Sequence, residues 1–309
     1  MRVWVTGGSG FVGSNVVKVL AERHGADVVA PTHAEVDLTD ADAVGAAVAD
    51  ARPDAIIHSA ILNDPAGLEA DRGAAWDAYV GATRAVVDAA NAVGAKVVLV
   101  STDWVFDGTQ SGADESTPPN PVNLYGVLKL ASELVVAERA RDGAVARISA
   151  VNGVHWARPV LPRSQDAGFG YFVASLVSAL EAGEPFTVWE RDDINMVATP
   201  SLASDCAELM WRIIDRDQQG TFHCCGGEAI GRWALAELAA DVFGLEAALL
   251  RSGPPPAAAV PIGTRIPHDT SLNAPATREA LGVELPSVRD QLERFRHERE
   301  SRSLVRAPM

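Results

Sequence analysis

The stretch Val3–Gly13, which reads VWVTGGSGFVG, decides the fold of this 309-residue chain. Its first part, Val3–Val5, is an apolar run that predicts a β-strand. Gly7, Gly10 and Gly13 then follow with the spacing G-x-x-G-x-x-G. The first glycine allows a tight turn, the second lets backbone N–H groups approach a pyrophosphate, and the third lets the next helix pack closely on the strand. Placed between a strand and a helix N-terminus, the motif predicts a dinucleotide-binding turn, and the alternative is a turn without a ligand.

Beyond this stretch, valine-rich apolar runs alternate with amphipathic, alanine-rich segments over the first half of the chain. Continuous apolar strands separated by helices are typical of a parallel sheet that helices cover on both faces. With right-handed crossovers, this pattern predicts an α/β fold with a doubly wound parallel sheet of the Rossmann type. We expect strands at 27–30, 55–59 and 96–101, and helices at 14–23, 41–50 and 74–93.

The regular alternation ends about halfway along the chain, where Pro and Gly become frequent. We therefore expect a dinucleotide-binding domain at 1–150. Residues 151–309 should form mainly a smaller substrate-binding lobe, with one returning segment that completes the main sheet. Two helices are predicted in that lobe, at 172–182 and 204–215. From Arg294 onward the tail is rich in charge and poor in apolar residues, which predicts a frayed helix end or disorder.

The composition argues against several classes of function. With 26 basic and 41 acidic side chains, the formal net charge is -15, which repels nucleic acids and anionic membranes. No run approaches the ~20 apolar residues of a membrane span, and no charged-then-apolar leader precedes the first strand. The three cysteines and seven scattered histidines form no metal-binding pattern. We expect a cytoplasmic protein that binds no nucleic acid, no membrane and no metal.

A second pattern, Tyr125-Gly-Val-Leu-Lys129, places two polar side chains one turn apart on one face of a helix. A tyrosine with its ordinary pKa near ~10 is a poor acid or base at neutral pH. A nearby ammonium, together with an oxidised nicotinamide, favours the phenolate and lowers that pKa. Only three tyrosines and three lysines occur in the chain, so chance pairing at this spacing is rare. The alternative is an exposed helix pair without chemistry.

Hydroxyl groups follow the strand at 96–101, in the sequence Ser101-Thr102-Asp103. Doubly wound sheets bind ligands outside the carboxyl ends of their strands. A hydroxyl at this point can hydrogen-bond a substrate carbonyl beside Tyr125, although Ser101 and Thr102 could equally form a turn or a helix cap. His58, at the end of another strand, is expected to be a satisfied core histidine rather than a catalytic one.

Three segments together resemble the extended short-chain dehydrogenases/reductases of the NAD-dependent epimerase/dehydratase superfamily. They are Thr6–Gly13, STDWVFDG at 101–108 and PNPVNLYGVLK at 119–129. Within that group, the chain is most similar to the dTDP-4-dehydrorhamnose reductase branch, which typically reads STDYVFDG and PxNxYGxxK. The likeness reaches from residue 1 to about residue 285 and is strongest in the first 130.

The resemblance implies a site in which Thr102 orients a carbonyl and Tyr125 delivers the proton. It implies that Lys129 lowers the pKa of Tyr125 and holds the nicotinamide ribose. Asp103 and Val105 would lie near the substrate, together with Tyr125. The implied cofactor-binding residues are Gly7, Gly10, Phe11, Val12, Gly13, Thr32, His33, Asp37, Leu38, Ser59, Ala60, Ile61, Ser101, Tyr125 and Lys129.

Three departures from the branch concern the substrate. A Trp that usually follows the sixth strand is here Ala150, an Asn in the helix after the third strand is Tyr79, and an Arg-Pro-x-Asn-Ser segment is replaced by IPHDT at 266–270. A pocket without that aromatic wall need not hold a deoxythymidine diphosphate sugar. The resemblance therefore implies the reaction type more firmly than the sugar.

Cofactor choice depends on the end of the second strand. A carboxylate there would bind the ribose 2′-hydroxyl and favour NAD, whereas a polar or cationic residue admits the 2′-phosphate of NADP. Ala30–His33 contain no acid. The sequence therefore favours NADP(H) over NAD(H), and use of both remains open.

Taken together, these residues predict an NAD(P)H-dependent reductase that transfers hydride to a keto group of a sugar or nucleotide-sugar. One alternative is an NAD-dependent sugar epimerase or dehydrogenase. Another is a non-catalytic NADP-binding regulatory subunit, like the β subunit of methionine adenosyltransferase. The complete set of Thr102, Tyr125 and Lys129 favours an enzyme. We expect a small-molecule keto-sugar as the partner. A homodimer through alanine-rich helices, such as 85–92, is left open by the sequence.

Overall fold

The computed structural model describes residues 1–62, 65–158, 164–260 and 264–305. Its main sheet has six parallel strands in the order β2-β1-β3-β4-β5-β10. They are β1 (Arg2–Thr6), β2 (Asp27–Val29), β3 (Ala55–His58), β4 (Lys96–Thr102), β5 (Gly143–Ile148) and β10 (Gly220–His223). The direction of winding reverses between β1 and β3, which is where doubly wound sheets bind their ligands. The predicted fold class is confirmed.

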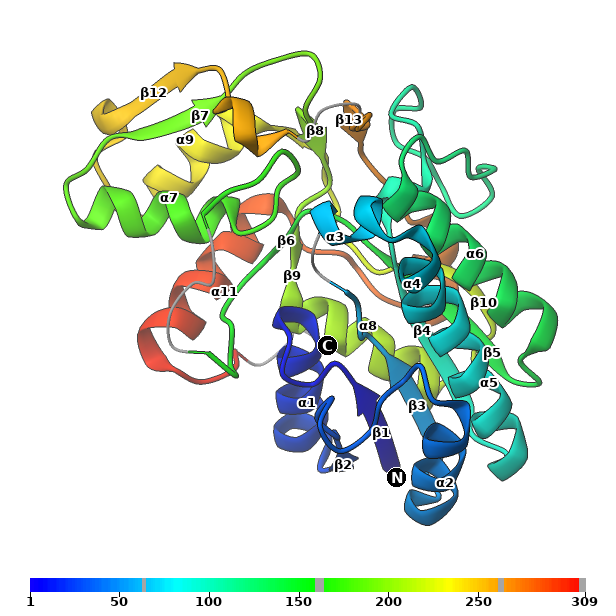
Figure 1. Cartoon of the computed structure of the whole chain (residues 1–309). Helices are drawn as coiled ribbons and strands as arrows, with labels where there is room; N and C mark the ends of the chain where they lie inside the picture. Colours follow the sequence, from blue (N-terminus) through cyan, green and yellow to red (C-terminus); the bar gives the residue numbers. More distant parts are fainter. Residues whose placement is uncertain (63–64, 159–163, 261–263, 306–309) are drawn as a thin grey trace.

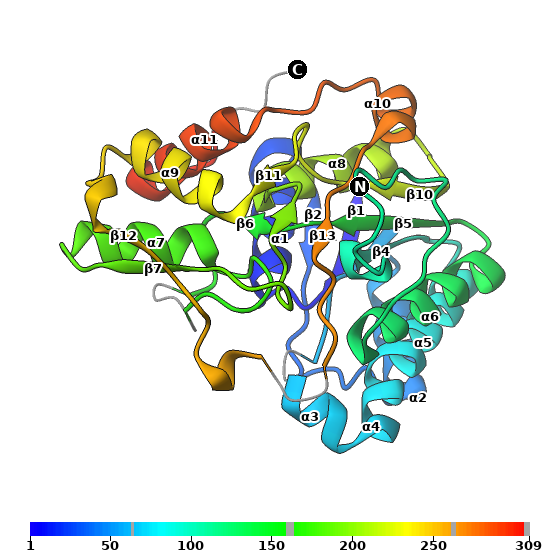
Figure 2. The same cartoon turned by 90° about the horizontal axis from the view of Figure 1, so that it is seen from above.

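Alternating side chains along each strand build two separate cores on the two faces of this sheet. Val3, Val5 and Ile57 pack on one face, and Trp4 and Ile56 pack on the other. The first face is covered by α1 (Phe11–His24) and α8 (Ala203–Asp215), and the second by α2 (Ala41–Ala51), α5 (Ala82–Val93) and α6 (Leu124–Arg139). Figure 2 shows α8 on one side of β4 and β5, with α5 and α6 on the other.

One helix was assigned to the wrong part of the molecule. We expected the segment 204–215 in the smaller lobe, but it forms α8, which packs beside α1 on the main sheet. Its buried residues Met210 and Ile213 share a core with Val16 of α1. Apolar periodicity identifies the buried face of a helix but does not say which surface that face meets.

The predicted helix 74–93 is divided into three helical segments. They are α4 (Arg72–Trp76), a five-residue π-helical turn η1 (Asp77–Gly81) and α5. A π-turn inserts an extra residue per turn and often occurs at functional sites. No Pro interrupts the helical pattern of this segment, so the sequence gives no sign of the π-turn.

The second lobe packs around its own apolar core, which includes Phe172, Leu176, Val188, Leu235 and Leu292. Its helices are α7 (Phe172–Glu181), α9 (Arg232–Phe243) and α11 (Val288–Ser301). Its short strands are β6 (Val151–Asn152), β7 (Phe186–Trp189), β8 (Val197–Ala198), β9 (Ser201–Leu202), β11 (Ile230–Gly231), β12 (Leu250–Gly253) and β13 (Asp269–Thr270). The remaining elements are α3 (Pro65–Ala70), α10 (Pro275–Leu281) and the 3₁₀ turns η2 (Asp103–Val105), η3 (Ala247–Leu249) and η4 (Ala257–Ala259).

The tail is more ordered than we expected. Ser287 caps α11 with a capping box, and the helix continues to Ser301. Phe295 and Glu298 are buried, and Arg294 forms a 2.9 Å ion pair with Asp205 of α8. Charged residues from Arg294 onward therefore pair across the helix interface instead of fraying, whereas residues 306–309 lie outside the described part of the chain.

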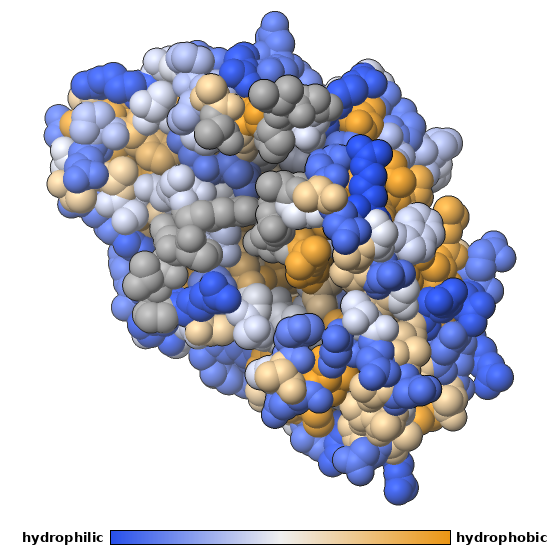
Figure 3. All heavy atoms as spheres, viewed as in Figure 1, coloured by the Kyte–Doolittle hydropathy of each residue, from blue (hydrophilic) through white to orange (hydrophobic). Residues whose placement is uncertain are grey.

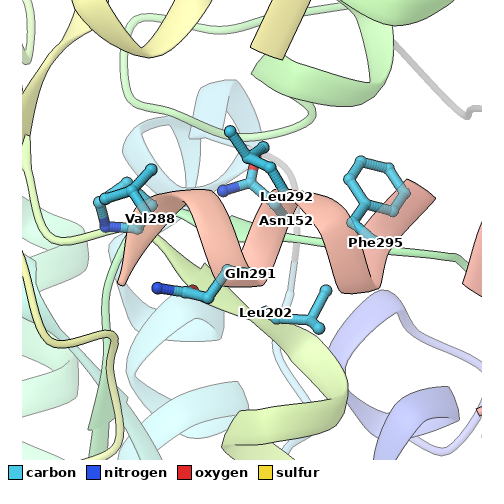
Figure 4. A pocket seen from close by; sticks show the side chains of 7 residues that line it. Asn152, Leu202, Val288, Gln291, Leu292 and Phe295 are labelled. Carbon is cyan, nitrogen blue, oxygen red and sulfur yellow. The ribbon is translucent and has the colours of Figure 1, made fainter. Parts of the chain in front are cut away.

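Helix α11 also lines a small pocket over β6 and β9. Val288, Leu292 and Phe295 project from it beside Asn152 and Leu202 (Figure 4). The cavity they enclose measures about 10 Å³, which is close to the space that one water molecule needs and far too small for a sugar. Among the described residues, no helix is both long and apolar enough to cross a membrane.

Candidate active site

The glycine-rich turn has the geometry that its sequence predicts. Gly7 adopts φ of +69°, and the Gly10 N–H donates to the Gly7 carbonyl at 2.8 Å. A Cβ on Gly13 would lie 2.1 Å from that same carbonyl oxygen, so a side chain there is sterically excluded. The turn requires glycine at positions 7 and 13 for its own backbone, independently of any ligand.

Gly10 differs because the described residues leave the space beside it open. Among the described residues, a Cβ on Gly10 would meet only the Gly7 carbonyl oxygen, at 3.1 Å. Helix α1 starts directly after Gly10, with no side-chain cap and no acidic residue in its first turn. The helix N-terminus therefore keeps its N–H groups and its positive dipole end for an anion. These features fit the pyrophosphate of a dinucleotide.

Phe11 and Val12 open α1, and Phe11 connects the turn to the second lobe. The centroid of the Phe11 ring lies 5.3 Å from that of Tyr171 and 5.9 Å from that of His155. Asn15, one turn further on, donates to the Val154 carbonyl at 2.9 Å. The predicted cofactor-binding turn thus contacts the segment that leads into the second lobe.

The end of β3 lies directly against this turn. The Ser59 hydroxyl donates to the Thr6 carbonyl at 2.6 Å, and the Ala60 N–H donates to the Thr6 hydroxyl at 3.1 Å. A Cβ on Gly7 would be 2.8 Å from Ala60. Ile61, the next residue, is exposed. The structure therefore brings Ser59, Ala60 and Ile61 to the same edge of the sheet as the glycines.

The residues after β2 form two local turns. Thr32 donates to the Glu35 carboxylate from its N–H at 2.7 Å and its hydroxyl at 2.9 Å. These hydrogen bonds lower the pKa of Glu35. Asp37 accepts from Thr39 in the same way, while His33 and Asp37 are exposed and Leu38 is half-buried. Residues 30–33 contain no acid, but the first turn places the Glu35 carboxylate within hydrogen-bonding distance of Thr32.

The second group of residues meets at the end of β4. Asn123 caps α6 by accepting from the Gly126 N–H at 2.9 Å. A Cβ on Gly126 would lie 2.2 Å from the Trp104 carbonyl oxygen, so glycine is what lets the first turn of α6 pack on η2. This close packing places the Tyr125 ring edge-on to Trp104, with the ring centroids 6.0 Å apart. It also brings Tyr125 to Thr102, whose hydroxyl affects the Tyr125 pKa.

The pKa of Tyr125 is raised above its ordinary value in this structure. Burial raises the pKa of Tyr125 to about 12, interaction with the Thr102 hydroxyl opposes the rise, and the charges of Asp103 and Asp166 add to it. The lowering of this pKa by Lys129 together with an oxidised nicotinamide stays a prediction. In this structure the Lys129 ammonium donates to the Val100 carbonyl at 2.8 Å.

Lys129 is buried, and its position explains its own pKa. Burial lowers the pKa of Lys129 to about 8, and the Glu133 carboxylate, one turn further along α6, acts in the opposite direction. The ammonium also lies 5.6 Å from the centroid of the Tyr79 ring. His58, nearby, is buried and hydrogen-bonded to Thr6 at 2.8 Å, and burial and Lys129 lower its pKa to about 3. His58 is thus a neutral core residue, as expected.

Ser101, Asp103 and Val105 are engaged within the protein. The Ser101 hydroxyl donates to Glu133 at 2.5 Å, and the contact of Ser101 with a cofactor stays a prediction. Glu133 is itself held by Arg147 in a buried pair at 2.7 Å, a network that sequence reasoning missed.

Asp103, which is predicted to lie near the substrate, is buried. Its carboxylate accepts from the Thr102 hydroxyl at 3.0 Å and from the Ser149 hydroxyl at 2.7 Å. Val105 is completely buried in a small apolar cluster. Asp103 therefore acts on Thr102, and the side chains of Asp103 and Val105 are both buried in this structure.

These two groups of residues share one edge of the molecule. In Figure 1, β1 runs from the N-terminus toward the second lobe, and because the sheet is parallel the other strands end on that side too. Figure 3 shows this face hollowed between the main sheet and the second lobe, with hydrophobic residues near the centre and hydrophilic ones around them. A hydroxyl, a phenol and an ammonium beside a dinucleotide-type turn can bind and protonate a carbonyl oxygen.

Comparison with known proteins agrees with this geometry. The family model described as the RmlD substrate binding domain matches residues 1–300. The chain belongs to this family. Its extended short-chain dehydrogenase/reductase character, predicted from three motifs, is thereby confirmed.

Two curated proteins illustrate the range of the RmlD family around this chain. The dTDP-4-dehydrorhamnose reductase of Burkholderia thailandensis is 29% identical over 299 residues, which are 94% of this chain and 96% of that protein. Methionine adenosyltransferase 2 subunit beta of Rattus norvegicus is 28% identical over 288 residues, 91% of this chain and 83% of that protein. The crystal structure of a Bacillus anthracis dTDP-4-dehydrorhamnose reductase, in complex with NADP, has the same fold, with a TM-score of 0.82, 24% identity and coverage of 96% and 99%.

Replacing Lys129 should stabilise this RmlD-family chain at neutral pH. The unfolded pKa of 10.5 falls to about 8 on folding, so the buried ammonium costs free energy below pH 8, and the free energy of unfolding rises as pH goes from about 8 to 10.5. Lys129→Met should remove this pH dependence. The variant also loses the hydrogen bond to the Val100 carbonyl, so its free energy of unfolding should exceed that of the parent chain by only ~1–2 kcal/mol at pH 7. Urea unfolding at pH 7 and pH 10 measures both effects. If the pH dependence of the free energy of unfolding were the same in the variant, Lys129 would not be the group whose pKa falls on folding.

Proposed function

We propose that the chain is an NAD(P)H-dependent reductase that transfers hydride to a keto group of a sugar or nucleotide-sugar. The observation that carries the proposal is the meeting of Thr102, Tyr125 and Lys129 at the same sheet edge as the glycine-rich turn. Relatives that carry the name dTDP-4-dehydrorhamnose reductase support it. A bound reduced nicotinamide would supply the hydride.

Each of the three residues has a distinct proposed role. Tyr125 donates its phenolic proton to the carbonyl oxygen, and its pKa of about 12 keeps that proton in place at neutral pH. Thr102 positions the carbonyl, for which its hydroxyl would turn from the buried Asp103 carboxylate, where it donates in this structure, to the carbonyl oxygen. Lys129 presents its ammonium near the ribose of the cofactor. Tyr125 must carry its proton to act as the acid in reduction, whereas oxidation of an alcohol would need it as the phenolate.

For the cofactor, we propose a nicotinamide dinucleotide held by the glycine-rich turn, by Ser59–Ile61 and by the segment after β2. NADP(H) is the preferred form in this proposal, because Ala30–His33 contain no acid. Use of NAD(H) stays open in this proposal: the Glu35 carboxylate that accepts from Thr32 would repel the 2′-phosphate that NADP(H) carries and NAD(H) lacks.

We propose that the two halves of the chain bind different ligands. Residues 1–150 bind the dinucleotide, and residues 151–309 bind mainly the substrate, although β10 and α8 of this half belong to the main sheet. The partner is a small keto-sugar. A homodimer stays a prediction from the alanine-rich helices.

A regulatory role is the second candidate, because the β subunit of methionine adenosyltransferase from rat is 28% identical over 91% of this chain. Titration of the nicotinamide fluorescence of NADPH and NADH, followed by addition of free and nucleotide-linked keto-sugars, separates the candidates. Oxidation of cofactor with one ketone supports the reductase. Binding without net oxidation favours an epimerase or a regulatory subunit, and no binding contradicts all three.

A further inference from the structure

Tyr79 lies in the π-helical turn η1 and is held there from both ends. Its backbone carbonyl accepts from the Thr83 hydroxyl at 2.6 Å, and its own hydroxyl donates to the Leu62 carbonyl at 3.0 Å. The residue is only 4% exposed. Because the extra residue of the π-turn shifts the helix locally, the ring occupies a position that a regular helix from 72 to 93 would not give it.

The fixed ring contacts both residues of the proposed proton-transfer pair. Its centroid lies 5.6 Å from the Lys129 ammonium, within the range of a cation–π interaction. It also meets the Tyr125 ring edge-on, with centroids 6.2 Å apart and an interplanar angle of 83°. Trp104 approaches Tyr125 from another element at 6.0 Å and 78°. Tyr125 is therefore packed against two aromatic rings, one of which also contacts the ammonium.

Ordinary core packing explains these contacts less well. The other buried members of this cluster are Leu68, Ala75, Val80 and Leu128, all aliphatic. An aliphatic side chain at position 79 could fill the same space, but it has no π face to offset the desolvation of a buried ammonium. It could also not form the hydrogen bond to Leu62 that fixes the ring. The aromatic ring of Tyr79 thus suits a position beside the Lys129 ammonium.

We propose that Tyr79 is a positioning residue that holds the Lys129 ammonium and the Tyr125 ring in place for proton transfer. The proposal rests on the proposed reductase function. Tyr79 itself donates no proton to the substrate, because its hydroxyl is bound to Leu62 and burial raises its pKa.

Kinetics of ring-retaining and ring-removing variants test this role. Tyr79→Leu should lower kcat ~10-fold because the pair is misplaced. KM for the cofactor should rise as well, since Lys129 also lies near the proposed ribose site, whereas KM for the ketone should change less than ~3-fold. Tyr79→Phe keeps the ring and should recover most of kcat. Phe186→Leu removes a buried ring from the second lobe and is the matched control for lost packing. Equal loss of kcat in all three variants would overturn the proposal.

Ionisation of Tyr125 gives a readout that needs no turnover. The chain has three tyrosines, so ¹³C labelling of the ring carbon that bears the hydroxyl gives three NMR signals, and Tyr125→Phe assigns one of them. Removing the Tyr79 ring should admit water, so the Tyr125 pKa should fall from about 12 by at least ~1 unit in Tyr79→Leu but not in Phe186→Leu. An unchanged Tyr125 titration would overturn the role of Tyr79. A shifted titration in a chain that reduces no ketone would support that role and reject the reductase.

Discussion

Tyr125→Phe is expected to remove at least ~100-fold of the turnover, which is the usual scale for a lost general acid. Phenylalanine keeps the ring between Tyr79 and Trp104, so the packing of α6 on η2 should persist. The variant should also bind the cofactor nearly as well as the parent chain, since the glycine-rich turn is untouched. Steady-state oxidation of reduced cofactor with the best ketone, together with a fluorescence titration, measures both quantities.

The matched control removes the neighbouring hydroxyl instead. Tyr79→Phe loses the bond that the hydroxyl donates to Leu62 and should lower kcat less than ~3-fold, because that hydroxyl gives no proton to the substrate and the ring is kept. If Tyr125→Phe turned over ketone as fast as the parent chain, Tyr125 would not be the proton donor. Another residue near Thr102 and Lys129 would then have to donate the proton.

Gly10→Val should weaken dinucleotide binding at least ~100-fold without unfolding the chain. The added Cβ would meet only the Gly7 carbonyl oxygen, at 3.1 Å, so the turn can adjust, but the branched side chain fills the space that the pyrophosphate needs. Isothermal titration with NADPH and NADH measures the loss, and circular dichroism checks the fold. Gly13→Val, by contrast, should destabilise the chain itself, since its Cβ would lie 2.1 Å from the same oxygen.

Gly45→Val is the control for this substitution. Gly45 lies in α2, and an added Cβ there meets nothing within 4 Å among the described residues. This variant should therefore fold and bind cofactor as the parent chain does. Unchanged cofactor affinity in Gly10→Val would place the dinucleotide elsewhere.

The sequence predicted the main sheet well because the signals are local. Each apolar strand is followed by a turn and an amphipathic helix, and predicted strand ends such as 55–59 differ from the observed Ala55–His58 by a residue. Helix α8 was misplaced because its apolar face fits either lobe. The π-turn around Tyr79 was missed because it contains no Pro to interrupt the helical pattern.

The site was predicted in part, for similar reasons. The Tyr-x-x-x-Lys spacing and the hydroxyls after β4 identified the residues, but not their partners. Ser101 and Glu133 are 32 residues apart, and a contact at that separation leaves no pattern in a single sequence. Glu35 was local but was overlooked, because its carboxylate reaches Thr32 only through the turn that follows β2.

The most direct test of the reductase is to follow the transferred hydrogen. The parent chain would be incubated with each keto-sugar of the panel and with NADPH or NADH carrying deuterium at both positions of the nicotinamide C4, and the product would be examined by mass spectrometry. We expect a hydroxyl product with one deuterium on the former carbonyl carbon and one cofactor oxidised per product. Tight cofactor binding without deuterium transfer to any ketone would contradict it.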